Sequence, residues 1–248
     1  MKILICMQYY EEDRLKAERV ISTMCDLLPE QSELVELAFV YRQDSKPPSS
    51  KIQLKAQEKF AAVHAWKTTR HGLGHPGGCN EMAYGILNHV PIERHLHKRF
   101  SDIAAILLLE SDVVFTRYNW DKELIGEWEK AVKANKLICG CVQPGVNESD
   151  RHVNGVALFD IDTANQLTCL RGGSLSIGWD YEHRMQLVPN ALHSPLFFLD
   201  YRRPTINPEA LFATRDGIAP LLYHGVKDNS AIESVEAMIK QTKKEQND

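Results

Sequence analysis

The sequence predicts a mixed α/β fold, with a mostly parallel central sheet flanked by helices. Two observations support this prediction. Short, continuous apolar segments recur along the chain, and such segments are typical of strands that are buried on both faces; Ile103–Leu109 is the most hydrophobic of them. Segments with helical periodicity separate the apolar ones, and this alternation is typical of parallel strands that are joined by helices.

The first forty residues predict a strand, a helix and a second strand. An apolar strand at Met1–Met7 leads into an acidic turn, and negative charge favours the N-terminus of a helix. The helical pattern then continues to Pro29. The second strand, at residues 34–41, carries apolar side chains at alternate positions. This order is the βαβ unit of parallel sheets.

The same alternation continues through the rest of the chain, after a loop at residues 42–52 that is rich in Pro and Ser. In order, we expect a helix at 53–60, a strand at 61–68, a helix that begins at Asn80, the strand at 103–109, a helix at 121–134, strands at 137–142 and 153–160, a helix at 162–170, a helix that ends at Leu187 and a late strand at 220–224. The polar residues 233–248 are expected to form a C-terminal helix or tail, which leaves residues 1–232 as a single domain.

The composition limits the classes of partner. A formal net charge of −4 gives no overall attraction to nucleic acid, so binding to a polyanion would need a local basic patch. The six cysteines form no CxxC pair, the chain begins in a strand without a signal peptide, and its longest apolar run is too short to cross a bilayer. These features predict a cytoplasmic protein without a membrane segment.

Two acidic residues, Glu110 and Asp112, directly follow the most apolar strand. Residues i and i+2 of an extended chain point to the same side, and open α/β sheets bind ligands at the carboxyl ends of their strands. Carboxylate oxygens suit Mg²⁺ or Mn²⁺, with a diphosphate to complete the coordination. A solvated turn is the alternative, but polar residues at later strand or loop ends, such as Asp180 and His224, favour a binding site.

His224 ends the late strand and begins the motif His-Gly-x-Lys-Asp. A histidine ring nitrogen can bind the same metal, and it would favour Mn²⁺ over Mg²⁺. Gly225 allows the backbone to approach a phosphate closely, and Lys227 can neutralise one. A hydrogen-bonded histidine in a turn is the alternative for this motif taken alone.

Together these motifs resemble the GT-A class of glycosyltransferases, in which an apolar strand ends in a DxD-like triplet and a late strand ends in His-Gly-x-Lys-Asp. The resemblance covers roughly residues 1–228. It implies a Rossmann-like sheet and a nucleoside-diphosphate sugar donor, with UDP as the expected nucleotide. It also implies that Asp112 and His224 bind Mn²⁺ or Mg²⁺. Glu110 replaces the usual first Asp, so it could contact either the metal or the sugar and ribose.

The segment 74–80, rich in Gly and Pro, leads into a predicted helix. It resembles the G-x-P-x-G-x-N stretch of small bacterial and phage glycosyltransferases, including those predicted to modify hydroxymethylated DNA bases. A helix N-terminus of this kind suits an anion, so Gly77 and Asn80 are candidates for donor binding. Arg70 could approach the diphosphate or the base. A tight turn without a ligand is the alternative.

The resemblance also implies roles for residues at other strand and loop ends. Asp180 lies where an inverting enzyme would hold the base that deprotonates the acceptor hydroxyl. It could equally cap a helix, with Trp179 anchored in the core. Gln8 and Tyr9 lie where a GT-A fold holds the base and ribose, and Tyr41 could stack on that base. Both tyrosines could instead be amphipathic residues at the edge of the sheet.

The acceptor is the part that the sequence specifies least. The phage resemblance implies a 5-hydroxymethyl pyrimidine in DNA, in a protein of the host cytoplasm, and the base would have to leave the stack to react. The basic stretch 89–99 and the pair Arg202-Arg203 could contact DNA phosphates, or could be solvated surface. Two other functions remain open. One is a nucleotidyltransferase, although the acidic segment after the first strand argues against it, and the other is an inactive GT-A-like binding module.

Overall fold

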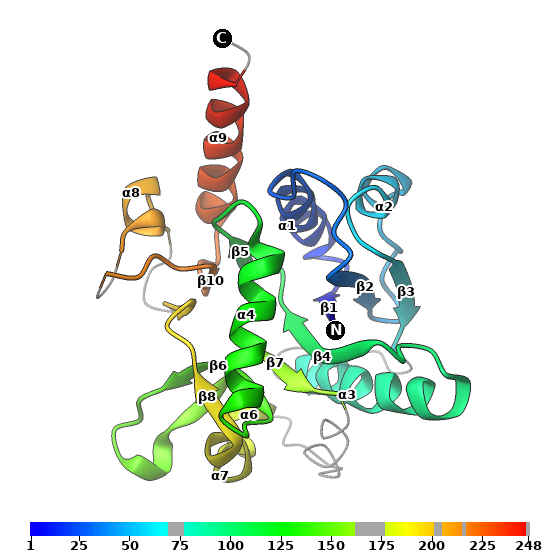
Figure 1. The fold of residues 1–248 in the computed structure, drawn as a ribbon, viewed down its shortest axis with the longest axis vertical. Helices are drawn as coiled ribbons and strands as arrows, with labels where there is room; N and C mark the ends of the chain where they lie inside the picture. Colours follow the sequence, from blue (N-terminus) through cyan, green and yellow to red (C-terminus); the bar gives the residue numbers. More distant parts are fainter. Residues whose placement is uncertain (69–76, 162–176, 201–204, 215–216, 247–248) are drawn as a thin grey trace.

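The computed structural model describes residues 1–68, 77–161, 177–200, 205–214 and 217–246. A seven-stranded sheet lies at the centre of these residues, with helices packed against both of its faces (Figure 1). Its strands follow the order β3-β2-β1-β4-β7-β6-β8. The fold class predicted from the sequence, a mostly parallel sheet flanked by helices, is therefore confirmed.

Four parallel strands form one half of the sheet. They are β1 (Lys2–Tyr9), β2 (Val35–Tyr41), β3 (Val63–Lys67) and β4 (Ile103–Leu109). Because these strands are parallel, their carboxyl ends lie on one edge of the sheet, where the chain continues from each strand into a loop. This edge brings the residues that follow β1, β2 and β4 together, although they are far apart in the sequence.

Three strands form the other half, and they introduce the antiparallel part of the sheet. They are β6 (Ile138–Gln143), β7 (His152–Asp160) and β8 (Ala191–His193). β7 is antiparallel to both β4 and β6, whereas β8 is parallel to β6. A second sheet of three strands has the order β5-β10-β9, with β5 (Val113–Phe115), β9 (Phe197–Leu199) and β10 (Leu222–His224).

The helices divide between the two faces of the large sheet. In β1, Ile3 and Ile5 face one hydrophobic core together with α1 (Arg14–Asp26), α2 (Ser50–Gln57), α4 (Trp120–Lys133) and α9 (Ser230–Glu245). Leu4 and Cys6 face the other core together with α3 (Gly77–His97), α6 (Trp179–Glu182) and α7 (Arg184–Leu187). In Figure 1, α3 accordingly lies on the opposite side of the sheet from α1 and α2. Strand residues that alternate between two cores are apolar at every position, which explains the continuous apolar runs of the sequence.

Three short helices complete the described part of the chain, namely the 3-10 helices at Glu148–Asp150 and Val188–Asn190 and the α-helix α8 (Pro208–Phe212). Among the described residues, no helix combines the length and the apolar character needed to cross a membrane.

Several predicted elements differ from the structure at their ends. α3 begins at Gly77, three residues before the predicted cap Asn80, and the side chain of Asn80 instead bonds to the chain at residues 177–179. The helix predicted to end at Leu187 is two short helices that break at His183. β5, β8, β9 and α8 were not predicted, because segments of three to five residues show no periodicity. The helix predicted at 162–170 lies outside the described residues.

The division of the chain at residue 232 stays a prediction, and α9 gives a way to test it. Ala231, Val235 and Ile239 of α9 are buried in the core shared with α1, and Arg19 of α1 forms an ion pair with Glu236.

A truncation after residue 232 should therefore fold with lower stability. Loss of the buried Val235 and Ile239 side chains removes on the order of 4 kcal/mol, which corresponds to a drop in melting temperature of about 10 °C. Differential scanning calorimetry measures this drop, and a truncation after Glu245 is the control. Equal melting temperatures for the two truncations would show that α9 contributes nothing to the fold.

Candidate functional site

The pairing between β5 and β10 brings the predicted metal ligands together. Glu110 directly follows β4, and the amide of Val113 donates a hydrogen bond to the Glu110 carbonyl (3.3 Å), so the chain turns at once into β5. In the antiparallel ladder, Val113 faces His224, the last residue of β10. The His224 ring consequently lies beside Asp112, the residue that precedes Val113.

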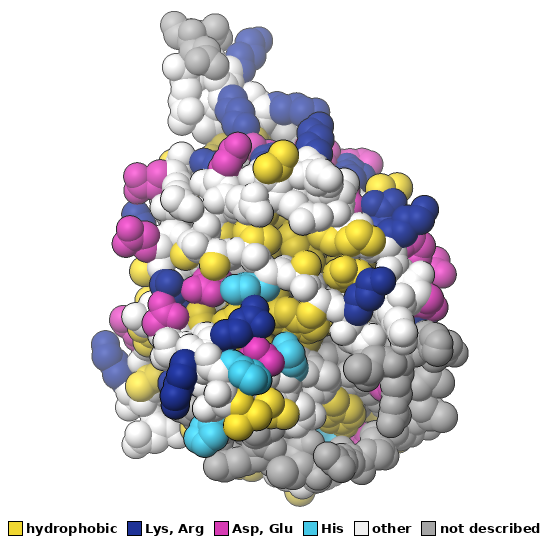
Figure 2. All heavy atoms as spheres, turned by 90° about the vertical axis from the view of Figure 1, so that its right-hand side faces the viewer, with side chains coloured by type: hydrophobic (Ala, Val, Ile, Leu, Met, Phe, Trp, Pro, Cys, Tyr) yellow, Lys and Arg dark blue, Asp and Glu magenta, His cyan; other side chains and the backbone are white. Residues whose placement is uncertain are grey.

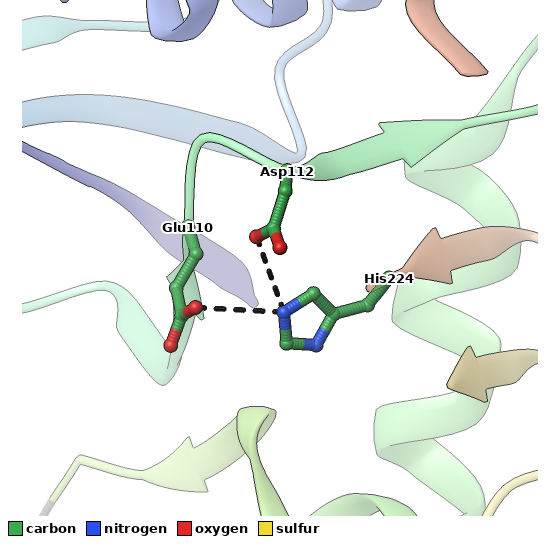
Figure 3. A group of neighbouring side chains, drawn as sticks. All are labelled: Glu110, Asp112 and His224. Carbon is green, nitrogen blue, oxygen red and sulfur yellow. Dashed lines mark ion pairs between the residues drawn. The ribbon is translucent and has the colours of Figure 1, made fainter. Parts of the chain in front are cut away.

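Three side chains converge at this turn (Figure 3). His224 Nε2 lies 3.2 Å from an Asp112 oxygen and 3.5 Å from a Glu110 oxygen. One ligand atom of each residue lies within 4.8 Å of the other two, which is a spacing that could hold a metal ion. The side chains of His224 and Asp112 are 2% and 7% exposed, whereas that of Glu110 is 41% exposed. Two carboxylates and an imidazole therefore form a donor set that is buried on one side and open on the other.

The charges of this group shift the pKa values of its members. Burial alone would lower the pKa of His224, but Asp112 and Glu110 outweigh this effect and raise it to about 9. Burial alone would raise the pKa of Asp112, but the neighbouring His224 and Lys227 lower it well below its usual range. Lys227 contacts the second oxygen of Asp112. At neutral pH and without a metal, the Asp112 carboxylate thus lies between two positive groups.

Gly225 allows Lys227 to reach Asp112. Its φ of 113° lies in a region that side-chain-bearing residues rarely adopt, so the chain can reverse directly after His224. As a result, the lysine that follows returns to the same carboxylate that faces the histidine.

A pocket of about 410 Å³ opens next to this group, at the carboxyl edge of β1, β2 and β4. Its volume is within the range of small-molecule sites. Its lining is mixed in charge: the cations are Lys16, Arg42 and Lys227, and the acids are Glu12, Asp13, Glu110 and Asp112. The carboxylates and the imidazole are suited to bind a metal ion, and the positive side chains beside them are suited to bind an anionic ligand of that ion.

The residues predicted for the nucleotide divide into two groups. Gln8 and Tyr9 line the pocket, as their place at the end of β1 suggested. Tyr9 is almost fully buried, and Tyr41 stacks against its ring with centroids 5.6 Å apart. Tyr41 is not among the residues that line the described pocket. One face of the Tyr41 ring is thus already covered by Tyr9.

Tyr10 and Arg42 also line the pocket, although the sequence analysis did not single them out as site residues. The Arg42 guanidinium lies over the Tyr10 ring, 4.8 Å from its centroid, and the Tyr10 hydroxyl donates to Cys79 Sγ at 3.2 Å. Both residues directly follow or end a parallel strand, so the rule that ligands bind at strand ends could have identified them.

The predicted loop before α3 is described only in part. Arg70 lies outside the described residues, and Gly77 is the first residue of α3. Asn80 is buried; its side-chain amide donates to the Ile177 carbonyl (2.9 Å), and its oxygen accepts from the Trp179 amide (2.8 Å). The Asn80 side chain therefore ties α3 to the segment that carries Asp180.

Asp180 is held by backbone groups on both oxygens. It accepts hydrogen bonds from the amides of Gly155 (3.0 Å) and Tyr181 (2.9 Å). Burial raises its pKa, and the charge of Glu110 adds to that effect, although His152 and the two amide bonds oppose it. Asp180 is not among the residues that line the described pocket, but a carboxyl group whose pKa is raised in part by the charge of Glu110 is suited to accept a proton.

Solved structures of glycosyltransferases share this fold. The chain is similar to TarS of S. aureus (11% identity, TM-score 0.51, 96% of this chain and 39% of that chain), to mouse xyloside xylosyltransferase 1 in its apo form (12%, 0.53, 93% and 99%) and to the glycosyltransferase GlyE of Streptococcus pneumoniae TIGR4 (11%, 0.57, 99% and 64%). It thus spans less than two thirds of the TarS and GlyE chains. No protein-family model and no curated protein sequence matches the chain. At these identities, the likeness establishes a fold of the GT-A type.

The raised pKa of His224 predicts how stability depends on pH in the absence of metal. The folded protein holds the His224 proton up to about pH 9, whereas an unfolded histidine loses it near 6.5. The stabilisation should therefore be complete below pH 6.5 and lost as the pH rises through 9, and it amounts to at most about 3 kcal/mol.

Urea unfolding of the wild type and of His224→Gln in EDTA, at pH 6 and pH 9.5, measures this contribution. The difference in the free energy of unfolding between the wild type and the variant should be larger at pH 6 than at pH 9.5. The variant also serves as the control, because His183 and His193, whose pKa values are lowered by burial, remain in both proteins. A difference that does not depend on pH would contradict the assigned pairing.

Proposed function

We propose that this protein is a metal-dependent glycosyltransferase that moves a sugar from a nucleoside-diphosphate sugar, with UDP as the first nucleotide to test, to an acceptor hydroxyl. The observation that supports it is the Glu110, Asp112 and His224 group beside a pocket with cations in its lining, at the strand edge where α/β sheets bind ligands. The GT-A type of fold is consistent with this activity.

The donor set fits a divalent metal ion. Asp112 and His224 are the proposed ligands, because both are buried and each presents one atom toward the other. Glu110 is more exposed, so it could complete the metal site or contact the sugar and ribose instead. An imidazole with carboxylates suits Mn²⁺ better than Mg²⁺. When bound, such an ion would neutralise part of the charge of the diphosphate leaving group.

The other cations of the pocket would act on the same diphosphate. Lys227 contacts Asp112 and is 66% exposed, so its ammonium group can turn toward a phosphate without loss of burial. Lys16 donates to the backbone carbonyl of Lys227 (2.7 Å), and both lysines line the pocket. Gly77, at the start of α3, is proposed to approach the donor through its backbone, and Arg70 and Asn80 remain proposed donor-binding residues from the sequence.

The nucleoside would bind at the ends of β1 and β2. Gln8 and Tyr9 remain proposed contacts, and Tyr41 would act by supporting the Tyr9 ring. The Arg42 and Tyr10 pair offers a flat surface in the pocket that is suited to stack on a base.

Asp180 is the proposed base. Its two amide hydrogen bonds fix the direction of the carboxylate, and its raised pKa brings it closer to the value that suits proton transfer at neutral pH. In an inverting reaction, an Asp180 oxygen would accept the proton of the acceptor hydroxyl as that hydroxyl attacks the anomeric carbon and the nucleoside diphosphate leaves.

Replacement of the buried ligand tests the donor site. Asp112→Ala should abolish the stabilisation that UDP gives in the presence of Mn²⁺, because binding to the folded state raises the melting temperature and the variant lacks the carboxylate that faces both His224 and Lys227. A thermal-shift titration of UDP with and without Mn²⁺ measures this.

Asp102→Ala is the matched control, because Asp102 lies at the opposite end of the same strand, β4, in an ion pair with Lys2. It should keep the full Mn²⁺-dependent shift. An unchanged shift in Asp112→Ala would refute the assignment of the site.

The acceptor of the sugar is proposed from the sequence resemblance. The sequence resemblance leads us to test a 5-hydroxymethyl pyrimidine of DNA first. The basic stretch 89–99 runs from the C-terminal half of α3 past its end, and its helical part, residues 89–97, lies about 15 to 27 Å along the helix from Cys79 at the pocket. Figure 2 shows the face that carries β3 and this end of α3, where histidines lie among both basic and acidic side chains. Glu93, which pairs with Arg99, is one of these acids, so the local charge is mixed.

A sugar-transfer assay on duplex DNA tests the acceptor and the base together. UDP-sugars labelled in the sugar should give labelled product with hydroxymethylated DNA and none with plain DNA. Asp180→Asn should reduce kcat by at least about 100-fold while the Mn²⁺-dependent UDP shift remains, since general-base catalysis is worth about 10²–10⁴-fold. Equal labelling of the two DNAs would eliminate this acceptor, and donor binding without transfer to any acceptor would favour an inactive binding module.

A further inference from the structure

A bulge in β7 contacts the His224 ring through the side chain of Asn154. In the antiparallel ladder with β6, Gly140 pairs with Ala157 and Val142 pairs with Val153, so that Cys141 alone lies opposite residues 154–156. A bulge of this kind releases backbone groups from the ladder and redirects side chains, and bulges are frequent next to active sites. The released amides of residues 155 and 156 donate to side chains instead of to β6.

The side chain of Asn154 fills this bulge and is 3% exposed. Its Oδ1 atom accepts a hydrogen bond from the Val156 amide at 3.0 Å, and the same atom lies 3.0 Å from Nδ1 of His224. A backbone amide can only donate, so the atom of Asn154 that faces it must be the oxygen rather than the amide nitrogen. The Val156 amide therefore determines which way the Asn154 side chain points.

This orientation determines the state of the His224 ring. An oxygen that faces Nδ1 can only accept, so Nδ1 must carry a proton. In a neutral imidazole, the proton on Nδ1 leaves the lone pair on Nε2. That nitrogen is the one that points toward Asp112 and Glu110, at 3.2 and 3.5 Å.

We propose that Asn154 is a positioning residue that fixes His224 in the Nδ1-protonated form, so that Nε2 is presented to a divalent metal ion. The inference rests on the proposed function, because it assumes that His224 is a metal ligand. Histidines that bind metals commonly donate their other ring N–H to a neighbouring group, and loss of that partner typically weakens metal binding about 10- to 100-fold.

The same bulge also holds the proposed base. While Asn154 orients His224, the amide of the next residue, Gly155, donates to Asp180. A Cβ atom added at Gly155 would lie 3.6 Å from the Asp180 carboxylate, in ordinary contact. An alanine at this position would therefore leave room for Asp180, and what β7 contributes to Asp180 is the hydrogen bond from the Gly155 amide. Two adjacent residues of one strand thus orient His224 and Asp180.

Two variants of Asn154 separate its acceptor role from its bulk. Asn154→Leu keeps the branched shape, with a somewhat larger side chain, but removes the oxygen, and we expect Mn²⁺, titrated alone and followed by EPR, to bind about 10- to 100-fold more weakly. Asn154→Asp keeps an acceptor for both donors, so its affinity should stay within about threefold of wild type or become tighter, because a carboxylate raises the basicity of the ring. Val153→Ala is the matched control, since it weakens packing on the same strand without touching His224.

The ring itself gives the second readout. In ¹⁵N NMR of the wild type loaded with Zn²⁺ as a diamagnetic probe, the His224 proton should be on Nδ1, and this reading does not depend on whether Asn154→Leu folds. A proton on Nε2 would overturn the inference. The inference would also be overturned if folded Asn154→Leu bound Mn²⁺ as tightly as the wild type while His224→Gln bound it weakly. In that case the proposed metal site would still stand. If His224→Gln also binds Mn²⁺ as tightly as wild type, both the metal site and the inference fail.

Discussion

The antiparallel pairing of β5 with β10 is the contact on which the proposed site depends. It sets the last residue of a late strand, His224, against the residue that precedes β5, Asp112, and both side chains are buried there. A buried carboxylate and a buried histidine would each be costly alone, but together they satisfy one another's charge. The turn at Glu110 adds a third residue, with a second carboxylate, on the side of the pocket. The positive φ of Gly225 allows Lys227 to return to Asp112.

The fold could be predicted to the extent that burial leaves a pattern in the sequence. β4 was predicted with its bounds at Ile103 and Leu109, because a strand covered on both faces is apolar throughout. Of the second sheet, which forms the site, the late strand β10 was predicted, but β5 and β9 were not, because strands of three residues have no measurable period. The start of α3 was misplaced because Asn80 resembles a helix cap, whereas its partners are residues 177–179, which are distant in sequence.

The acidic and histidine members of the site could be recognised from the sequence because each follows or ends a strand. The same rule, that ligands bind at strand ends, was not applied to every residue that follows a strand. Tyr41 was named as the site residue at the end of β2 and Arg42 was not considered, yet Arg42 lines the pocket while Tyr41 stacks against Tyr9. The role inferred for Asn154 depends on a bulge and on one backbone amide. Neither can be read from a single sequence, because both follow from the register of two strands.

The position of the metal ion is the most direct test of the proposed site. Crystals grown with UDP and Mn²⁺ would locate the ion through the anomalous scattering of manganese, independently of any transfer assay. We expect one anomalous peak at coordination distance from His224 Nε2 and an Asp112 oxygen, with the diphosphate of UDP on the open side of the ion. UDP bound in the pocket with no anomalous peak between Asp112 and His224 would contradict the proposed site.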